Sequence, residues 1–189
     1  MRIVLLGPPG AGKGTQAKKL AIAADVVHVA SGDLFRRHQE DDSQLGRLAK
    51  SYMEKGELVP DEVTIRMVLE RIHEADAENG YVLDGFPRTL AQAKALDDAL
   101  EREGSAIDRV PLVEVEYEEL MHRLSGRWIC GRCQTPYHQD SAPPQKDGFC
   151  DLCGGELYQR FDDRQESVQR RLAVYKEHAY PLTSYYQGQ

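Results

Sequence analysis

The chain has 189 residues and a formal net charge of −7, from 24 Lys and Arg against 31 Asp and Glu. This length suits one domain, or one domain with a small insertion, and the acidic balance argues against a nucleic-acid-binding protein, which normally carries a basic face. No apolar run approaches the roughly 20 residues that cross a membrane, and residues 3–6 are too short an apolar stretch for a signal peptide. We therefore expect a cytoplasmic protein without nucleic-acid or membrane partners.

Short apolar runs alternate with amphipathic segments along the chain. The predicted strands are residues 2–6, 26–29, 81–83 and 110–115. Helices are predicted to begin at Lys13, at a cap by Asp61, at a capping box of Thr89 with Gln92, and at a cap by Asp163. Strands that alternate with helices indicate a parallel sheet covered by helices on both faces. The sequence therefore predicts a three-layer α/β fold.

A glycine-rich loop joins the first predicted strand to the first predicted helix. It reads Gly-Pro-Pro-Gly-Ala-Gly-Lys-Gly-Thr over residues 7–15. Its glycines let successive backbone N–H groups face one anion, the helix N-terminus adds its dipole, and Lys13 supplies a mobile cation. Gly14 stands where the general phosphate-loop pattern has Ser or Thr, and the hydroxyl follows at Thr15. The alternative is a turn without a ligand, but a lysine directly after such a turn serves no packing purpose.

Asp84 and Arg88 follow the predicted strand at residues 81–83, within the segment Asp-Gly-Phe-Pro-Arg. Ligands of open α/β sheets bind at the carboxyl ends of strands, so Asp84 is placed to hold Mg²⁺ through water. Its alternative role is to cap the turn that follows. Arg88 comes after Pro87 in a rigid turn, which suits a planar guanidinium directed at a phosphate.

All four cysteines lie in one short segment, as Cys130-Gly-Arg-Cys133 and Cys150-Asp-Leu-Cys153. This C-x₂-C…C-x₂-C spacing is typical of a zinc site, and four thiolates leave no open position, so the site would be structural. Gly131 and Gly154 are expected to ease the two turns. Two disulfides or unliganded thiols are the alternatives, and a reducing cytoplasm disfavours disulfides. Residues 126–160 lack helical periodicity and are expected to form a small inserted unit.

With these motifs the chain resembles the adenylate kinase family. The resemblance covers essentially all of the chain and also rests on Ser31-Gly-Asp-Leu-Phe-Arg36, on Arg123 with Arg127, and on Arg160 with Asp162-Asp163. It implies a P-loop NTPase-type sheet with a small zinc-binding lid, and Mg²⁺-dependent transfer of the γ-phosphoryl group of ATP to AMP, giving two ADP. It also implies a monomer. The implied parts are a core of residues 1–29, 60–121 and 161–189, an AMP-binding segment of residues 30–59, and a mobile zinc-binding lid of residues 122–160.

The resemblance also implies roles for individual residues. The catalytic residues would be Lys13, Asp84, Arg88, Arg123, Arg160 and Arg171. ATP would contact Gly10, Ala11, Gly12, Lys13, Gly14, Thr15, Arg123 and Arg127. AMP would contact Ser31, Arg36, Glu57, Val59, Gly85, Arg88, Gln92, Arg160 and Arg171. The zinc ligands would be Cys130, Cys133, Cys150 and Cys153. Ser31 could instead cap a helix beginning near Asp33, and any single arginine could be a surface charge.

Three alternatives to this function stay open at the level of sequence. A relative could use GTP or phosphorylate another monophosphate, a zinc ribbon with an accessory ATPase could bind nucleic acid, and a non-catalytic structural role is the third. The resemblance further implies a fifth strand and a final helix beyond Gln189 that supply part of the ATP adenine pocket. Without them we expect weaker base recognition and an uncovered strand edge.

Overall fold

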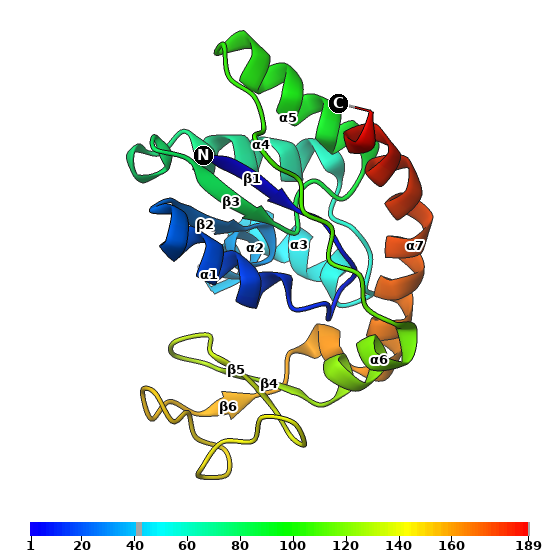
Figure 1. Cartoon of the computed structure of the whole chain (residues 1–189). Coiled ribbons are helices and arrows are strands. Elements are labelled where there is room, and N and C mark those ends of the chain that lie inside the picture. The colour runs from blue at the N-terminus through cyan, green and yellow to red at the C-terminus, as the bar shows by residue number, and fades with distance from the viewer. Residues whose placement is uncertain (41–42, 189) are drawn as a thin grey trace.

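The computed structural model describes residues 1–40 and 43–188 and contains one parallel and one antiparallel sheet (Figure 1). In the parallel sheet, β3 (Tyr81–Asp84) lies between β1 (Arg2–Leu5) and β2 (Val27–Ala30). The described helices are α1 (Lys13–Ala24), α2 (Ser31–Glu40), α3 (Gln44–Met53), α4 (Asp61–Ile72), α5 (Leu90–Arg102), α6 (Tyr117–Ser125) and α7 (Gln165–Gln187), with short 3₁₀ turns η1 (Ala75–Ala77) and η2 (Phe161–Asp163). No described helix is both long and apolar enough to cross a membrane.

Alternation of side chains along the strands builds the three predicted layers. Ile3 and Leu5 of β1 pack with Ala17 and Ala21 of α1 on one face of the sheet. The side chains between them, such as Val4, belong to the larger core on the other face, which α4, α5 and α7 complete. Because neighbouring positions in a strand point to opposite faces, a short run of apolar residues serves both layers, and the predicted α/β fold is confirmed.

The predicted fourth strand at residues 110–115 is wrong as a regular strand. The chain does run parallel to β1 here, with bonds from Asp108 N to Arg2 O (2.9 Å), from Leu6 N to Pro111 O (3.0 Å) and from Val113 N to Leu6 O (2.9 Å), but it forms only isolated bridges. Val4 N donates to Arg109 O at 3.0 Å, and the reciprocal bond to Val4 O would have to come from residue 111. Residue 111 is a proline without an N–H group, so the ladder is interrupted.

The cysteine-bearing segment forms a separate small unit, residues 126–160, as predicted. Its strands β4 (Arg127–Cys130), β5 (Pro136–His138) and β6 (Leu157–Tyr158) form an antiparallel sheet in the order β5-β4-β6. The chain enters and leaves this unit at one place, because Gln159 Nε2 donates to Ser125 O at 2.8 Å. Figure 1 shows the unit hanging below the parallel sheet, next to α6 and the start of α7.

The predicted helix caps are only partly correct. Thr89 caps α5 by accepting a bond from Gln92 N at 3.2 Å, but the Gln92 side chain accepts from Arg88 N instead of closing a capping box. Asp61 is the first residue of α4, after Pro60, and its carboxylate bonds elsewhere. Asp163 ends η2 and pairs with arginines, so it does not cap α7. In both errors a carboxylate near a helix start is used for a tertiary contact.

Candidate functional site

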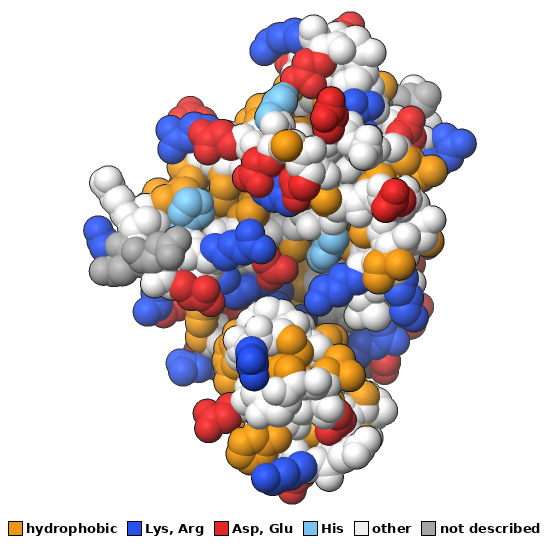
Figure 2. Space-filling model, turned by 90° about the vertical axis from the view of Figure 1, so that its left-hand side faces the viewer, with side chains coloured by type: hydrophobic (Ala, Val, Ile, Leu, Met, Phe, Trp, Pro, Cys, Tyr) orange, Lys and Arg blue, Asp and Glu red, His pale blue; other side chains and the backbone are white. Residues whose placement is uncertain are grey.

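A cavity of about 880 Å³ opens at the carboxyl ends of the core strands and extends towards the small unit. In Figure 2, Lys and Arg side chains gather along the boundary between the main body and the small unit below it. The lining includes the predicted site residues Gly10, Gly12, Lys13, Gly14, Thr15, Ser31, Arg36, Glu57, Val59, Asp84, Gly85, Arg88, Gln92, Arg123, Arg127, Arg160 and Arg171. Ala11 is outside this lining: it is buried against Leu120 and Leu124 of α6, and its N–H donates to Pro8 O at 3.2 Å.

The glycine-rich loop presents the unpaired N-terminus of α1 to this cavity. Gly12 precedes the helix in the left-handed conformation (φ 88°) and contributes no side-chain cap, so the first N–H groups of the helix stay available for an anion. Lys13 Nζ donates to Gly7 O and Pro8 O, both at 2.8 Å. Burial lowers the pKa of Lys13 to about 8, although the charge of Asp84 opposes the shift.

Asp84 ends β3 beside the glycine-rich loop. A Cβ at residue 14 would lie 3.1 Å from Asp84 Oδ2, which gives a physical reason for Gly14 where related loops carry a hydroxyl residue. His28 Nε2 of β2 lies 3.6 Å from the same oxygen, a close electrostatic contact that is too long for a hydrogen bond. Burial acts to raise the pKa of Asp84, but the adjacent His28 ring and the Lys13 charge outweigh it, so the pKa is lowered and the carboxylate stays ionised. Sequence reasoning missed His28, whose only signal was a polar residue within an apolar strand.

Gly85 brings Ser31 and Arg88 together at the end of β3. Its carbonyl oxygen accepts from Ser31 Oγ and from Arg88 Nε, both at 2.7 Å. Gly85 has a positive φ of 74°, and a Cβ there would lie 2.9 Å from Arg88 Nη2, so only glycine fits. The alternative of Ser31 as a helix cap is wrong, because Ser31 is itself the first residue of α2 and its hydroxyl crosses to β3.

Four further arginines line the same cavity as Arg88. Arg127 of β4 donates to both carboxylate oxygens of Asp163, with Nε 2.8 Å from Oδ2. Arg171 of α7 lies 3.1 Å from Oδ1 of the same carboxylate and 3.1 Å from Asp162 Oδ2. Arg36 pairs with Asp33. Arg160 Nε is buried with no hydrogen-bond partner in the described structure, and an orphaned buried donor of this kind indicates a site built for an anion.

The pKa values of Arg88 and Arg160 report the crowding of the cations, whereas at Arg127 burial is outweighed by the Asp163 carboxylate, which raises the pKa. Burial lowers the pKa of Arg88 to about 10, and the charge of Arg171 adds to this shift. Burial also lowers the pKa of Arg160, with Arg36 and Arg127 contributing next. The nearby carboxylates do not offset these effects, so a multiply charged anion would relieve the repulsion. Arg123 is different, because it is exposed on α6 and its Nε lies 2.6 Å from Glu119 Oε1.

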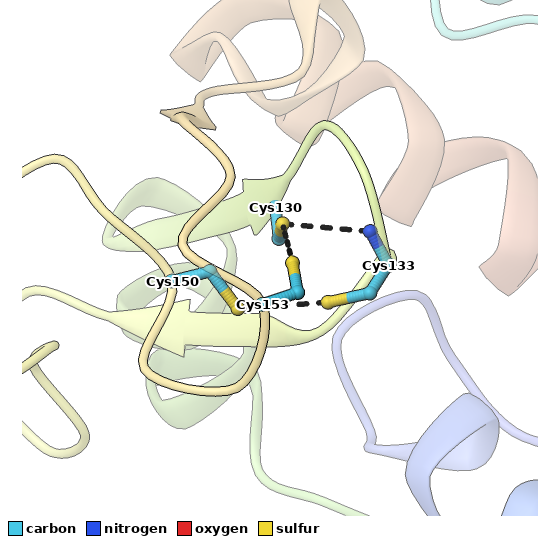
Figure 3. A group of neighbouring side chains, drawn as sticks. All are labelled: Cys130, Cys133, Cys150 and Cys153. Carbon is cyan, nitrogen blue, oxygen red and sulfur yellow. Dashed lines mark hydrogen bonds between the residues drawn. The ribbon is translucent and has the colours of Figure 1, made fainter.

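The four cysteines of the small unit converge, as their spacing predicts (Figure 3). All four sulfur atoms lie within 4.8 Å of one another, with Cys130 Sγ 3.4 Å from Cys153 Sγ and Cys133 Sγ 3.5 Å from Cys150 Sγ. No disulfide joins them, so that alternative is wrong. Four sulfurs at about 2.3 Å from a tetrahedral ion would stand roughly 3.8 Å apart, so the cluster is compatible with zinc.

Hydrogen bonds favour the thiolate forms of two of the sulfurs, whereas at Cys153 the backbone bond from Gly155 is outweighed by the neighbouring sulfurs, which raise its pKa to about 12. The Thr135 hydroxyl lowers the pKa of Cys133 to about 6, and the Tyr137 hydroxyl, 3.3 Å from Cys150 Sγ, lowers the pKa of Cys150. Gly154 adopts a positive φ of 68° at the second turn, as expected, but the first turn uses Gln134 (φ 57°) in this role rather than Gly131. The expectation for Gly131 is therefore wrong, because the left-handed residue follows the second cysteine of the pair.

The family model for adenylate kinase matches residues 5–189. The chain is similar to the adenylate kinase of Caldicellulosiruptor bescii (50% identity over 188 residues, 100% of this chain and 87% of that protein). It is also similar to the adenylate kinases of Streptomyces coelicolor (51% over 190 residues, 100% and 88%) and Streptomyces avermitilis (52% over 190 residues, 100% and 86%).

Proposed function

The chain belongs to the adenylate kinase family, and on this premise we propose that it transfers the γ-phosphoryl group of ATP reversibly to AMP, giving two ADP. The observation that supports this most directly is a single cavity with phosphate-binding groups at two places. The glycine-rich loop with Lys13 suits a triphosphate, and the arginines around Arg88 suit a second phosphate facing it. A transfer between two nucleotides needs two such places, whereas simple ATP hydrolysis needs one.

Each group in the cavity has a distinct task in this proposal. The loop N–H groups and Lys13 hold the β- and γ-phosphates, while Arg36 and Arg88 hold the AMP phosphate in line with the γ-phosphorus. Arg160 and Arg171 stabilise the charge that spreads over the transferring oxygens. The attacking AMP oxygen is already anionic, so the reaction needs no general base.

We propose that Asp84 holds Mg²⁺ through water molecules, because an ionised carboxylate beside the phosphate loop suits the oxygen ligands that Mg²⁺ prefers. When bound, Mg²⁺ would neutralise charge on the β- and γ-phosphates. For the acceptor base, Ser31, Gly85, Val59 and Gln92 line one stretch of the cavity. Residues 30–59 are accordingly proposed as the AMP-binding segment and residues 122–160 as a lid that excludes water during transfer.

Zinc is proposed as the ion of the small unit. The four converging cysteines would fill every tetrahedral position, so the metal would be structural and take no part in the chemistry. The core of this unit is small and itself includes Cys130 and Cys150 beside Tyr137. A unit of this size cannot bury enough apolar area to fold on its own, and metal binding would supply the missing stability.

The proposed reaction is tested by a coupled assay of ADP formation from ATP, AMP and Mg²⁺. We expect Arg88→Ala to lower kcat/KM by about 100-fold or more, since it removes a preorganised charge at the transfer site. Arg66→Ala is the matched control, because Arg66 is exposed on α4 outside the cavity lining. Absence of turnover with ATP and AMP, but turnover with GTP or another monophosphate, would replace adenylate kinase activity by that of a related nucleotide kinase.

A further inference from the structure

Gln92 is held in the cavity wall by two hydrogen bonds of opposite polarity. The side chain lies in the first turn of α5, and the residue is only 1% exposed. Its Nε2 donates to Asp61 Oδ1 at 2.7 Å, and its Oε1 accepts from Arg88 N at 2.7 Å. Both ends of the amide are therefore engaged within the protein before any ligand arrives.

These two partners determine which way round the amide lies. A carboxylate can only accept a hydrogen bond, so the atom beside Asp61 must be the NH₂ group. A backbone N–H can only donate, so the atom beside Arg88 N must be the oxygen. A flipped amide would place its oxygen against the Asp61 carboxylate and its NH₂ group against the Arg88 N–H. The orientation thus follows from chemistry and does not depend on how the two similar atoms are assigned.

Asp61 is itself fixed in place and lies outside the cavity lining. It opens α4, and its second carboxylate oxygen, Oδ2, accepts from Thr89 Oγ1 at 2.9 Å. Thr89 in turn caps α5, the helix that carries Gln92. Asp61 therefore connects the starts of α4 and α5, and its direct contact with a residue of the cavity lining is the one with Gln92.

The fixed amide leaves one N–H of Nε2 and one lone pair of Oε1 for a ligand. A 6-aminopurine presents a matching pair, because its exocyclic N6 donates and its ring N1 accepts. A 6-oxopurine presents the reverse pair, an accepting O6 and a donating N1–H. A base placed identically would then meet two mismatched contacts, oxygen against oxygen and N–H against N–H.

We propose that Asp61 is a positioning residue that sets the preference for a 6-aminopurine monophosphate over a 6-oxopurine monophosphate by locking the orientation of the Gln92 amide. This inference rests on the proposed function, since it concerns the acceptor of that reaction. Sites that hydrogen-bond a substrate group reject analogues that mismatch it strongly, because buried polar groups are then left unpaired. Without Asp61, only the N–H of Arg88 opposes rotation of the Gln92 amide, so the orientation that suits a 6-oxopurine becomes less costly.

The test measures kcat and KM for AMP and for inosine monophosphate in wild type, Asp61→Asn and Glu62→Gln. An asparagine can donate or accept towards Gln92, so Asp61→Asn keeps the shape and removes one of the two restraints on the amide, leaving only the bond from Arg88 N. We expect the ratio of kcat/KM for AMP to that for inosine monophosphate to fall at least about tenfold. Glu62→Gln removes the same charge from the same first turn of α4, outside the cavity, and should leave the ratio unchanged.

The inference is overturned if Asp61→Asn leaves the ratio of the two kcat/KM values unchanged, or if Glu62→Gln lowers it equally. In either case, AMP turnover by the wild type still upholds the proposed function. No AMP turnover by wild type sinks both. If Asp61→Asn folds poorly, a measurement on the wild type alone still tests the inference. In the ¹⁵N-labelled wild type, AMP should shift the Gln92 side-chain proton that Asp61 does not bind and leave the other in place. Equal shifts of both protons, or none, would overturn the lock.

Discussion

Single residues divide into those whose roles follow from a local motif and those that only the fold brings together. Lys13 and the cysteine pairs are recognisable from neighbours within a few positions, and the structure places them as the sequence predicts. His28 and Asp61 carry no such local signal, because their partners lie 56 and 28 or more residues away in the chain. Contacts of this kind depend on which strands and helices become neighbours, and the periodicity of the sequence does not specify that.

Lys13 gives a pH dependence whose direction follows from its burial. Its pKa is lowered to about 8 in the free protein, so the cation is present below that pH and is lost as the pH rises through it. We expect kcat/KM for ATP to fall about tenfold per pH unit above 8, while kcat persists to higher pH because bound phosphates favour the charged form.

The measurement is a pH profile of kcat/KM from 6.5 to about 9.5, with Lys13→Arg as the comparison. Arginine stays charged over this range, so the variant should lose the descending limb even if its overall rate is lower. The pKa of Arg88, at about 10, is too high to cause a limb that begins near 8. A flat wild-type profile would contradict the assignment.

At the scale of elements, the sequence predicted α1, α4, α5, α7 and three core strands but not α3 or α6, and local chemistry explains where other predictions failed. Pro111 interrupts the ladder beside β1, so an apolar run that looks like a strand forms only bridges. Carboxylates near helix starts were predicted as caps, yet Asp61 and Asp163 bond to other elements. Propensity describes what a residue does alone, and tertiary contacts override it where a stronger partner is available.

The small unit should depend on its metal for stability more than the reaction does. Because its strands are short and its core is built around cysteines, we expect a strong chelator to lower the melting temperature by about 5 °C or more. Activity at moderate temperature should fall much less. The control is the same chelator already saturated with zinc.

Two results would contradict this expectation. Loss of turnover from a fully folded, metal-free protein would argue against a purely structural role for the ion. Four thiols that react freely before chelation, together with an unchanged melting temperature, would argue against zinc binding itself. Scanning calorimetry and a thiol-reactivity assay measure the two quantities directly.

At the scale of the whole molecule, the order of strands β1-β3-β2 and the convergence of distant arginines lay beyond sequence reasoning. Asp163 lies where the small unit meets α7. It is 1% exposed and pairs with Arg127 from the small unit and Arg171 from α7. This buried carboxylate, together with the neighbouring Asp162, balances the charges of two guanidinium groups.

We expect Asp163→Asn to lower the free energy of unfolding by about 3–5 kcal/mol, because breaking a buried ion pair leaves its partners uncompensated. Urea unfolding measures this loss. Asp147→Asn serves as control, since Asp147 is exposed on the small unit. Equal losses for the two variants would show that Asp163 contributes no more than a surface charge.

The chain enters and leaves the small unit at neighbouring points, and this affects how the unit could move. Gln159 bonds to Ser125 where the chain enters and leaves, so the two chain crossings lie at one place, which would act as the fulcrum of a rotation. A rotation about that fulcrum displaces each atom in proportion to its distance from it. Arg127, beside the fulcrum, would travel little, whereas the loops between β5 and β6, furthest from the core sheet in Figure 1, would sweep the longest arc. A fluorescent label on those loops would therefore report the rotation of the small unit with the least disturbance to the arginines.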